Sequence, residues 1–256
     1  MPAEDLALEA AQALERLRER APRIHCVTNA AAQVMTANGL LALGAIPSLT
    51  VNPREIADFV SGADALLINL GTLDADRISA IDTAMEIASE ERTASVLDPV
   101  FIDVSEVRRD FARTLVAREP EVIRLNAREL AALAGSETPD VNLCALEWLT
   151  TLAVTGETDW VADGSSRVAI GDGHPLMAQV TAMGCLASAV IAAFLPVTRS
   201  PLVAAIAGLG AMGIAGELAG GKAAGPGSFA VSFIDALAGL TPAMLRSRLE
   251  ITDEAV

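Results

Sequence analysis

Aromatic and basic side chains are scarce in this 256-residue chain, which has no tyrosine, two tryptophans, six phenylalanines and a single lysine. So few aromatic rings leave little surface on which nucleic-acid bases could stack. The 33 acidic residues outnumber the 18 basic ones, and the formal net charge is −15. Such a surface repels nucleic acids and anionic lipids. We therefore expect neither a nucleic acid nor a membrane among the partners.

Cysteines are also few, and no segment has the pattern of an export signal. There are three cysteines, an odd number, and they lie far apart in the sequence: Cys26, Cys144 and Cys185. This argues against a disulfide framework and against a zinc site. The N-terminus begins with an amphipathic pattern instead of a basic segment followed by an apolar one. The longest apolar run, residues 202–216, is shorter than a bilayer span. These features predict a cytoplasmic protein.

Hydrophobic residues make up 52% of the chain, enough for a sizeable aliphatic core. Short apolar runs alternate with helical patterns through the first half. Strands are predicted at 24–27, 47–51, 65–70, 94–97 and 122–125, and helices at 6–17, 30–43, 53–60, 78–88 and 107–116. The strands are continuously apolar, which is typical of a parallel sheet covered by helices on both faces.

The second half begins with three strand patterns, and the remainder is helical. The strands are predicted at 152–155, 159–162 and 167–170, with a hairpin signal at Asp163-Gly164 that indicates an antiparallel edge. Helices are predicted at 184–195, 201–219 and 229–239, with Ser200 and Ser228 as N-caps. No linker, repeat or low-complexity tract interrupts the chain. We therefore expect residues 1–256 to form one α/β domain.

Polar residues recur where the predicted strands end, at the edge where open α/β sheets bind ligands. They are Asn29, Asn69, Gly71, Thr72, Asp98, Arg124 and Asn126. Asp98 is either a turn former before Pro99 or a carboxylate that faces phosphates. Arg124 fits bidentate phosphate binding, or else a surface salt bridge. Glu129 completes a capping box with Asn126, and could also hold Mg²⁺ through water.

The segment 181–185 precedes an apolar helix pattern. Unpaired N–H groups and the positive end of the helix dipole make such a helix start a natural anion site, as phosphoryl transfer requires. The same field would favour the thiolate of Cys185, although an inert core cysteine fits the pattern equally well. A nucleophilic dyad of Cys185 with His174 lacks an orienting group. Residues 208–213 match G-x-G-x-x-G, but inside a helix pattern, which argues against a dinucleotide site.

Eight segments, taken in order, resemble those of the hydroxyethylthiazole kinases, ribokinase-like enzymes of thiamine synthesis and salvage. They are HCVTN (25–29), TANGLLALGA (36–45), NLGTL (69–73), LDPV (97–100), VIRLNARE (122–129), VTGE (154–157), GHPLM (173–177) and GPGSF (225–229). They extend over nearly the whole chain. The resemblance implies a three-layer α/β/α ribokinase-like fold and a mostly parallel sheet with an antiparallel edge. It also implies ATP-dependent phosphorylation of the primary alcohol of 4-methyl-5-(2-hydroxyethyl)thiazole, with Mg²⁺.

The resemblance also implies roles for individual residues. ATP contacts would come from Arg124, Thr155 and Gly184, and the magnesium ion would lie near Asp98 and Glu129. Substrate contacts would come from Asn29, Leu49, Gly71 and Ala182. Cys185 takes the position at which many ribokinase-like relatives carry an aspartate base, and would either accept the proton of the alcohol or orient the hydroxyl. The family forms homotrimers with the thiazole site between subunits.

The chain departs from the family pattern beside the expected substrate. The family usually has T-G-T-G-C where this chain has TAMGC at 181–185, so Ala182 replaces a glycine and Met183 a small threonine. If position 182 needs a positive φ, alanine costs about 1 kcal/mol there. Leu49 stands at a family methionine, and Gln179 where lysine is common.

Three other functions stay open at this point. One is a related kinase for a hydroxymethylpyrimidine or pyridoxal type of alcohol, and another is a catalytically weak nucleotide- or thiazole-binding protein. An ADP-forming repair dehydratase is the third, but it normally needs the aspartate that Cys185 displaces.

Overall fold

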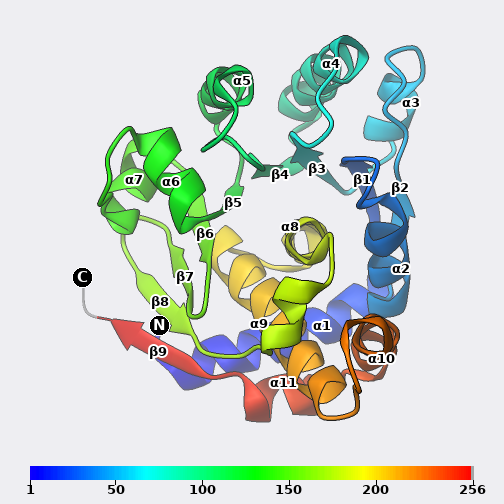
Figure 1. The fold of residues 1–256 in the computed structure, drawn as a ribbon, viewed down its shortest axis with the longest axis vertical. Helices are drawn as coiled ribbons and strands as arrows, with labels where there is room; N and C mark the ends of the chain where they lie inside the picture. The colour runs from blue at the N-terminus through cyan, green and yellow to red at the C-terminus, as the bar shows by residue number, and fades with distance from the viewer. Residues whose placement is uncertain (255–256) are drawn as a thin grey trace.

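A computed structural model of the protein describes residues 1–254, which build one nine-stranded sheet (Figure 1). The strand order is β2-β1-β3-β4-β5-β6-β7-β8-β9. All pairings from β2 to β6 are parallel, and those from β6 to β9 are antiparallel. The prediction of a mostly parallel sheet with an antiparallel edge is therefore confirmed. The strands are β1 (Arg23–Val27), β2 (Ile46–Ser48), β3 (Ala65–Asn69), β4 (Ala94–Asp98), β5 (Val122–Asn126), β6 (Thr151–Thr155), β7 (Asp159–Ala162), β8 (Arg167–Ile170) and β9 (Ile251–Glu254).

Helices cover both faces of the sheet, and each layer has its own apolar core. One layer holds α1 (Ala3–Arg20), α2 (Gln33–Leu43), α8 (Met183–Phe194), α9 (Pro201–Gly220), α10 (Pro226–Gly239) and α11 (Pro242–Arg248). The other holds α3 (Ile56–Val60), α4 (Ala75–Glu91), α5 (Glu106–Val116), α6 (Ala127–Ala134) and α7 (Val141–Glu147). Alternate residues of a strand face opposite layers, so Leu67 packs in the first core and Leu66 in the second.

The helix α9 is the centre of the first layer. Its length and composition would suffice to cross a membrane, but the helix is mostly buried inside the fold, as core helices are. A Cβ built on Gly208 would lie 2.7 Å from Cγ1 of Ile191, and one on Gly213 would lie 2.7 Å from the carbonyl oxygen of Asp172. The glycines of the G-x-G-x-x-G match therefore serve close packing. The first helix, α1, packs against α9 and α11.

Several boundaries differ from the prediction. The segments α7, α11 and β9 were not expected, and a 3₁₀ turn, η1 (Pro175–Gln179), precedes α8. The strand β2 ends at Ser48 instead of 51, because the side chains of Thr50 and Asn52 bond the local backbone and replace strand pairing. The helix α10 begins at Pro226, so Ser228 is not its N-cap; the Ser228 hydroxyl instead accepts N–H bonds from 224 and 225.

Candidate active site

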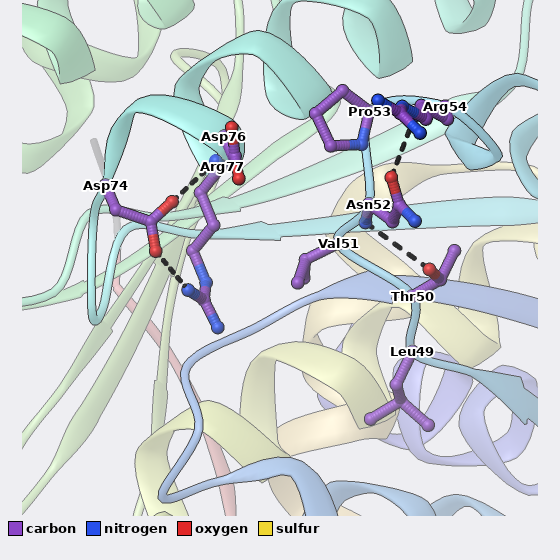
Figure 2. Close-up of a pocket in the computed structure, with 9 residues that line it drawn as sticks. All are labelled: Leu49, Thr50, Val51, Asn52, Pro53, Arg54, Asp74, Asp76 and Arg77. Atoms are coloured by element: carbon purple, nitrogen blue, oxygen red, sulfur yellow. Dashed lines mark hydrogen bonds and ion pairs between the residues drawn. The ribbon is translucent and has the colours of Figure 1, made fainter.

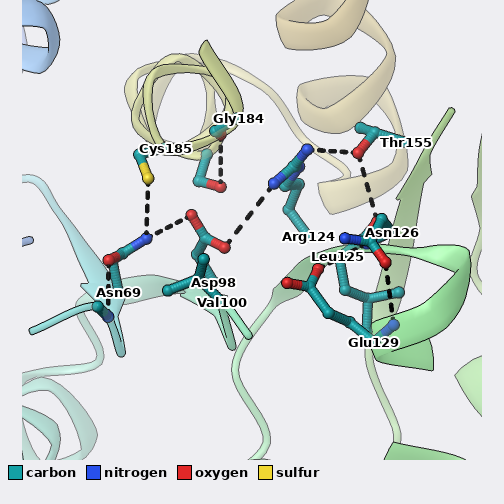
Figure 3. Close-up of polar contacts among 12 residues, drawn as sticks. Asn69, Asp98, Val100, Arg124, Leu125, Asn126, Glu129, Thr155, Gly184 and Cys185 are labelled. Carbon is teal, nitrogen blue, oxygen red and sulfur yellow. Dashed lines mark hydrogen bonds and ion pairs between the residues drawn. The ribbon is translucent and has the colours of Figure 1, made fainter. Parts of the chain in front are cut away.

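The predicted site residues meet where several parallel strands end. Asn69 ends β3 and pairs in register with Asp98, which ends β4. Asn126 and Thr155 end β5 and β6 and are likewise partners in register. The first turn of α8 lies over this edge and brings Cys185 to it (Figure 3). Parallel pairing therefore assembles side chains that lie far apart in the sequence.

Asn69 is the hub of the polar network at this edge. Its Oδ1 accepts hydrogen bonds from Nδ2 of Asn29 at 3.1 Å and from the backbone N–H of Gly71 at 3.0 Å. Its Nδ2 donates to Oδ2 of Asp98 at 2.6 Å and to Sγ of Cys185 at 3.3 Å. Because a backbone N–H can only donate, the contact with Gly71 fixes the orientation of the amide. Every hydrogen-bonding position of this buried side chain is thus used.

Cys185 is a buried neutral thiol rather than a thiolate. Its Sγ accepts hydrogen bonds from Nδ2 of Asn29 at 3.2 Å and Nδ2 of Asn69 at 3.3 Å. Burial, followed by the negative charge of Asp98, raises the pKa of Cys185 to about 12. The expectation that the start of α8 favours the thiolate is therefore wrong, since desolvation and the neighbouring carboxylate outweigh the two amide donors and the charge of Arg124, which lower the pKa.

Asp98 and Arg124 form an incompletely satisfied charge pair. Asp98 is fully buried, and its Oδ1 has no hydrogen-bond partner among residues 1–254. Nη1 of Arg124 lies 3.8 Å from that oxygen, and Nη2 donates to the hydroxyl of Thr155. Burial raises the pKa of Asp98, and the charge of Arg124 opposes that rise. The alternative of a surface salt bridge is wrong, because the pair lies inside the site with polar capacity to spare.

Gly184 allows the guanidinium to approach the first turn of α8. A Cβ at this position would lie 2.6 Å from Nη1 of Arg124. The first N–H of this segment to bond within the helix is that of Leu186, which donates to the carbonyl oxygen of Ala182 at 2.8 Å. The preceding N–H groups, at 183–185, therefore have no partner within the helix, and Gly184 among them lies against the Arg124 guanidinium. We call these N–H groups and the guanidinium the donor cluster, a set of donors suited to an anion.

The Glu129 side chain caps α6, and its charge interacts with that of Asp98. Its Oε2 accepts the N–H of Asn126 at 2.9 Å, which confirms the capping box, and its Oε1 accepts the N–H of Phe101 at 2.8 Å. Burial raises the pKa of Glu129, and the charge of Asp98 adds to the rise. The two carboxylates thus repel one another, and a bound cation would relieve that repulsion.

The carboxylate oxygens available here suit a metal ion whose other ligands come from water and phosphate. Among residues 1–254, no three His, Cys, Asp or Glu side chains are grouped as a metal cage. The free Oδ1 of Asp98 offers one oxygen, and both oxygens of Glu129 already accept backbone N–H bonds. Mg²⁺ keeps several waters and binds through one or two carboxylates plus phosphates, so these residues suit it.

Ala182 adopts the strained backbone that its replacement of a glycine implied. Its φ is +69°, in the left-handed region, directly before α8. At position 71 glycine is required for a different reason, because a Cβ there would lie only 2.5 Å from Cβ of Asn29.

Leu49 is the one predicted substrate residue that lies apart from this cluster. It follows β2 and lines a separate pocket of about 760 Å³, together with residues 50–54, Asp74, Asp76 and Arg77 (Figure 2). None of the residues clustered around Cys185 lines that pocket. The structure thus brings together Asn29, Gly71, Asp98, Arg124, Glu129, Thr155, Gly184 and Cys185, with Ala182 beside them.

Asn69 was expected only as one of the polar residues at strand ends, with no role in the site. The signal was a polar amide that interrupts the apolar run 65–70, where burial demands partners for it. His25, which lies in the HCVTN segment, was given no role either, yet it is completely buried in β1.

Comparison with known proteins agrees with this geometry. The chain matches the hydroxyethylthiazole kinase family over residues 14–243. It is 44% identical over 248 residues to a hydroxyethylthiazole kinase of Granulibacter bethesdensis, covering 91% of this chain and 90% of that protein. The structure of a hydroxyethylthiazole kinase from Pyrococcus horikoshii has a TM-score of 0.92 and 36% identity, covering 96% of this chain and 99% of the other. The fold is also shared with a ribokinase-like superfamily protein from Enterococcus faecalis, at 13% identity and a TM-score of 0.67, covering 94% of this chain and 96% of the other. The prediction of a ribokinase-like fold is therefore confirmed.

Proposed function

The chain belongs to the hydroxyethylthiazole kinase family, and from that membership we propose that it transfers the γ-phosphoryl group of ATP to the primary alcohol of 4-methyl-5-(2-hydroxyethyl)thiazole, in thiamine synthesis or salvage. The observation that carries the proposal is the donor cluster of the first turn of α8 and Arg124, with the free oxygen of Asp98 beside it. Residues 1–256 would act as one kinase domain.

In this proposal the phosphates of ATP lie between Arg124 and the first turn of α8. The N–H groups at 183–185 and the helix dipole would stabilise the charge that develops on the transferred group. The Thr155 hydroxyl, bonded to the guanidinium, supports the orientation of Arg124 and would itself contact the nucleotide. Gly184 supports the role because any side chain there would push the guanidinium away.

We propose Mg²⁺ as the cofactor, with Asp98 as a ligand and Glu129 acting through water. The ion, when bound with ATP, supplies neutralisation of phosphate charge. The capping bonds of Glu129 hold its carboxylate in place whether or not a ligand is present.

Cys185 would orient the alcohol rather than take its proton. A thiol whose pKa is about 12 stays protonated at neutral pH, and a protonated thiol cannot serve as a base. Its S–H can instead hydrogen-bond the substrate hydroxyl while Asn29 and Asn69 hold the sulfur. Phosphoryl transfer through a loose transition state asks little of a base, so positioning would supply most of the rate.

We further propose a cytoplasmic homotrimer in which Leu49 contributes to a thiazole site shared between protomers. Leu49 lines a pocket to which none of the residues around Cys185 contributes, and this supports a shared site. Large apolar side chains are exposed on α2, β2 and α10, which pack side by side: Val34, Leu41, Ile46 and Val231. Grouped exposed apolar residues are typical of protein interfaces.

A coupled assay of ADP formation tests the proposal. We expect ATP turnover that depends on Mg²⁺ and on hydroxyethylthiazole, and none above background with pyridoxal or hydroxymethylpyrimidine. Turnover with pyridoxal or hydroxymethylpyrimidine, but not with hydroxyethylthiazole, would show that the protein is a related kinase for that other alcohol. Tight thiazole binding, measured by calorimetry, without any phosphoryl transfer would indicate a binding protein.

A further inference from the structure

His25 lies outside the Cys185 cluster, in the middle of β1, and its side chain is completely buried. Its Nδ1 is 2.8 Å from Oγ of Ser48, and its Nε2 is 3.2 Å from the carbonyl oxygen of Thr50. These two partners are the residues on either side of Leu49. One imidazole therefore holds the chain both before and after the leucine that lines the 760 Å³ pocket.

The partners determine which ring nitrogen carries the hydrogen. A carbonyl oxygen only accepts, so Nε2 is the donor to Thr50, and Nδ1 accepts from the Ser48 hydroxyl. Burial lowers the pKa of His25 to about 4, against the opposing effect of the Thr50 bond, so the ring is neutral at physiological pH. A single neutral tautomer satisfies both nitrogens. The Phe59 ring, 5.8 Å away between centroids and tilted by 34°, covers the imidazole.

The segment after β2 has little other support from the sheet. The strand β2 is three residues long, lies at the end of the sheet and pairs only with β1. Beyond it, the chain is tied by local bonds, such as that of the Arg54 N–H to Oδ1 of Asn52 at 3.0 Å (Figure 2) and that of Thr50 to Glu55. These bonds join the segment to itself, whereas the His25 bonds tie it to the core.

We infer that His25 is a positioning residue, which fixes Leu49 and the adjoining pocket wall by holding Ser48 and Thr50. The inference rests on the proposed function only in that Leu49 contacts the thiazole. If it does, loss of the imidazole lets that wall move and weakens thiazole binding. The ATP pocket, built by Arg124 and α8, is not touched by His25 and keeps its affinity.

A double-mutant cycle with His25→Ala and Leu49→Ala tests this route. Because the imidazole makes two hydrogen bonds, we expect His25→Ala to raise the KM for hydroxyethylthiazole about tenfold, with the KM for ATP within about twofold of wild type. In the Leu49→Ala background, His25→Ala should add less than about twofold, because the residue through which it acts is gone. Multiplicative effects of the two substitutions would overturn the inference. His25→Gln, which keeps an N–H able to reach Thr50, should recover part of the loss.

A matched control separates positioning from general destabilisation. Thr150 is also buried, and its hydroxyl donates to the carbonyl oxygen of Pro120 at 2.6 Å, just before the start of β6 and so at the opposite end of that strand from the site. Thr150→Val removes this buried bond and should leave the thiazole KM unchanged. A rise in KM equal to that of His25→Ala would show that lost stability alone explains the effect, and would overturn the inference.

Amide hydrogen exchange tests, without any substrate, whether His25 holds residues 46–56 in place. We expect His25→Ala to speed exchange at residues 46–56 by about tenfold or more while β5 and β6 keep wild-type protection. Unchanged exchange at 46–56 would overturn the inference. If the wild-type protein does not turn over hydroxyethylthiazole, the proposed function fails, and the exchange result still tells whether His25 holds this segment.

Discussion

Replacing Asp172 by asparagine should stabilise the protein at alkaline pH. Asp172 follows β8 and is 8% exposed. Its Oδ2 accepts the N–H of Glu250 at 3.2 Å, and its Oδ1 has no hydrogen-bond partner in the described part of the chain. Burial is the main cause that raises the pKa of this carboxyl from 3.8 to about 7. The negative charges of Glu217 and Glu250 add to the rise. The hydrogen bond from the Glu250 N–H and the positive charge of Arg248 oppose it.

The sign and size of the effect follow from this pKa. The folded state holds the proton of Asp172 more tightly than the unfolded state does, so wild-type stability is lost as pH rises from 3.8 to about 7. At 1.36 kcal/mol for each pKa unit, the loss amounts to about 4 kcal/mol. Asparagine cannot ionise, and it keeps a carbonyl oxygen for the Glu250 N–H. Asp172→Asn should therefore gain up to about 4 kcal/mol over wild type above pH 7, and almost nothing at pH 4.

Urea unfolding at pH 4 and pH 8, with wild type and variant side by side, measures this difference. Asp110→Asn is the matched control, because Asp110 is exposed and pairs only at the surface with Arg113; its effect should stay small at both pH values. A variant that is less stable than wild type at pH 8, or a difference that is the same at both pH values, would refute the reasoning.

Three further predictions concern the candidate active site. Cys185→Ala should lower kcat but retain measurable turnover with a near-normal KM for ATP, because the thiol positions the hydroxyl; an unchanged kcat would remove Cys185 from the reaction. Arg124→Ala should raise the KM for ATP about tenfold or more, since the guanidinium is part of the donor cluster; an unaltered KM would count against that contact. Ala182→Gly relieves a φ of +69° and should raise the free energy of unfolding by up to about 1 kcal/mol in urea melts; a loss of stability would show that the position is not strained.

The sheet and the edge that carries the site could be predicted from the sequence. Continuous apolar runs such as 65–68 identify buried parallel strands, and parallel strands necessarily end at one edge. Asp98 and Thr155, which lie 57 positions apart in the chain, were thereby placed at the same edge. The capping box at Asn126 is a purely local pattern, and it formed as predicted.

The properties that failed to follow from the sequence depend on groups brought together only by folding. The pKa of Cys185 is governed by burial and by Asp98, which no local pattern connects to it. The position of Leu49 depends on where β2 ends, and side-chain bonds around Thr50 and Asn52 set that end. The segments α11 and β9 were missed, although Thr241 before Pro242 is a regular helix start, in which the threonine side chain accepts the N–H of Met244.

The packing of α1 against α9 and α11 sets a limit on when the protein can fold during its own synthesis. The first helix leaves the ribosome early, but the surface that buries it is translated some 200 residues later. At typical elongation rates of 5–20 residues per second, the apolar face of α1 waits roughly 10 to 40 seconds for its partner. Throughout that interval Leu6, Leu14 and Leu17, which are buried in the folded protein, lack the surface of α9 and α11 that covers them. A chaperone that binds this apolar face would protect the chain until α9 and α11 are translated.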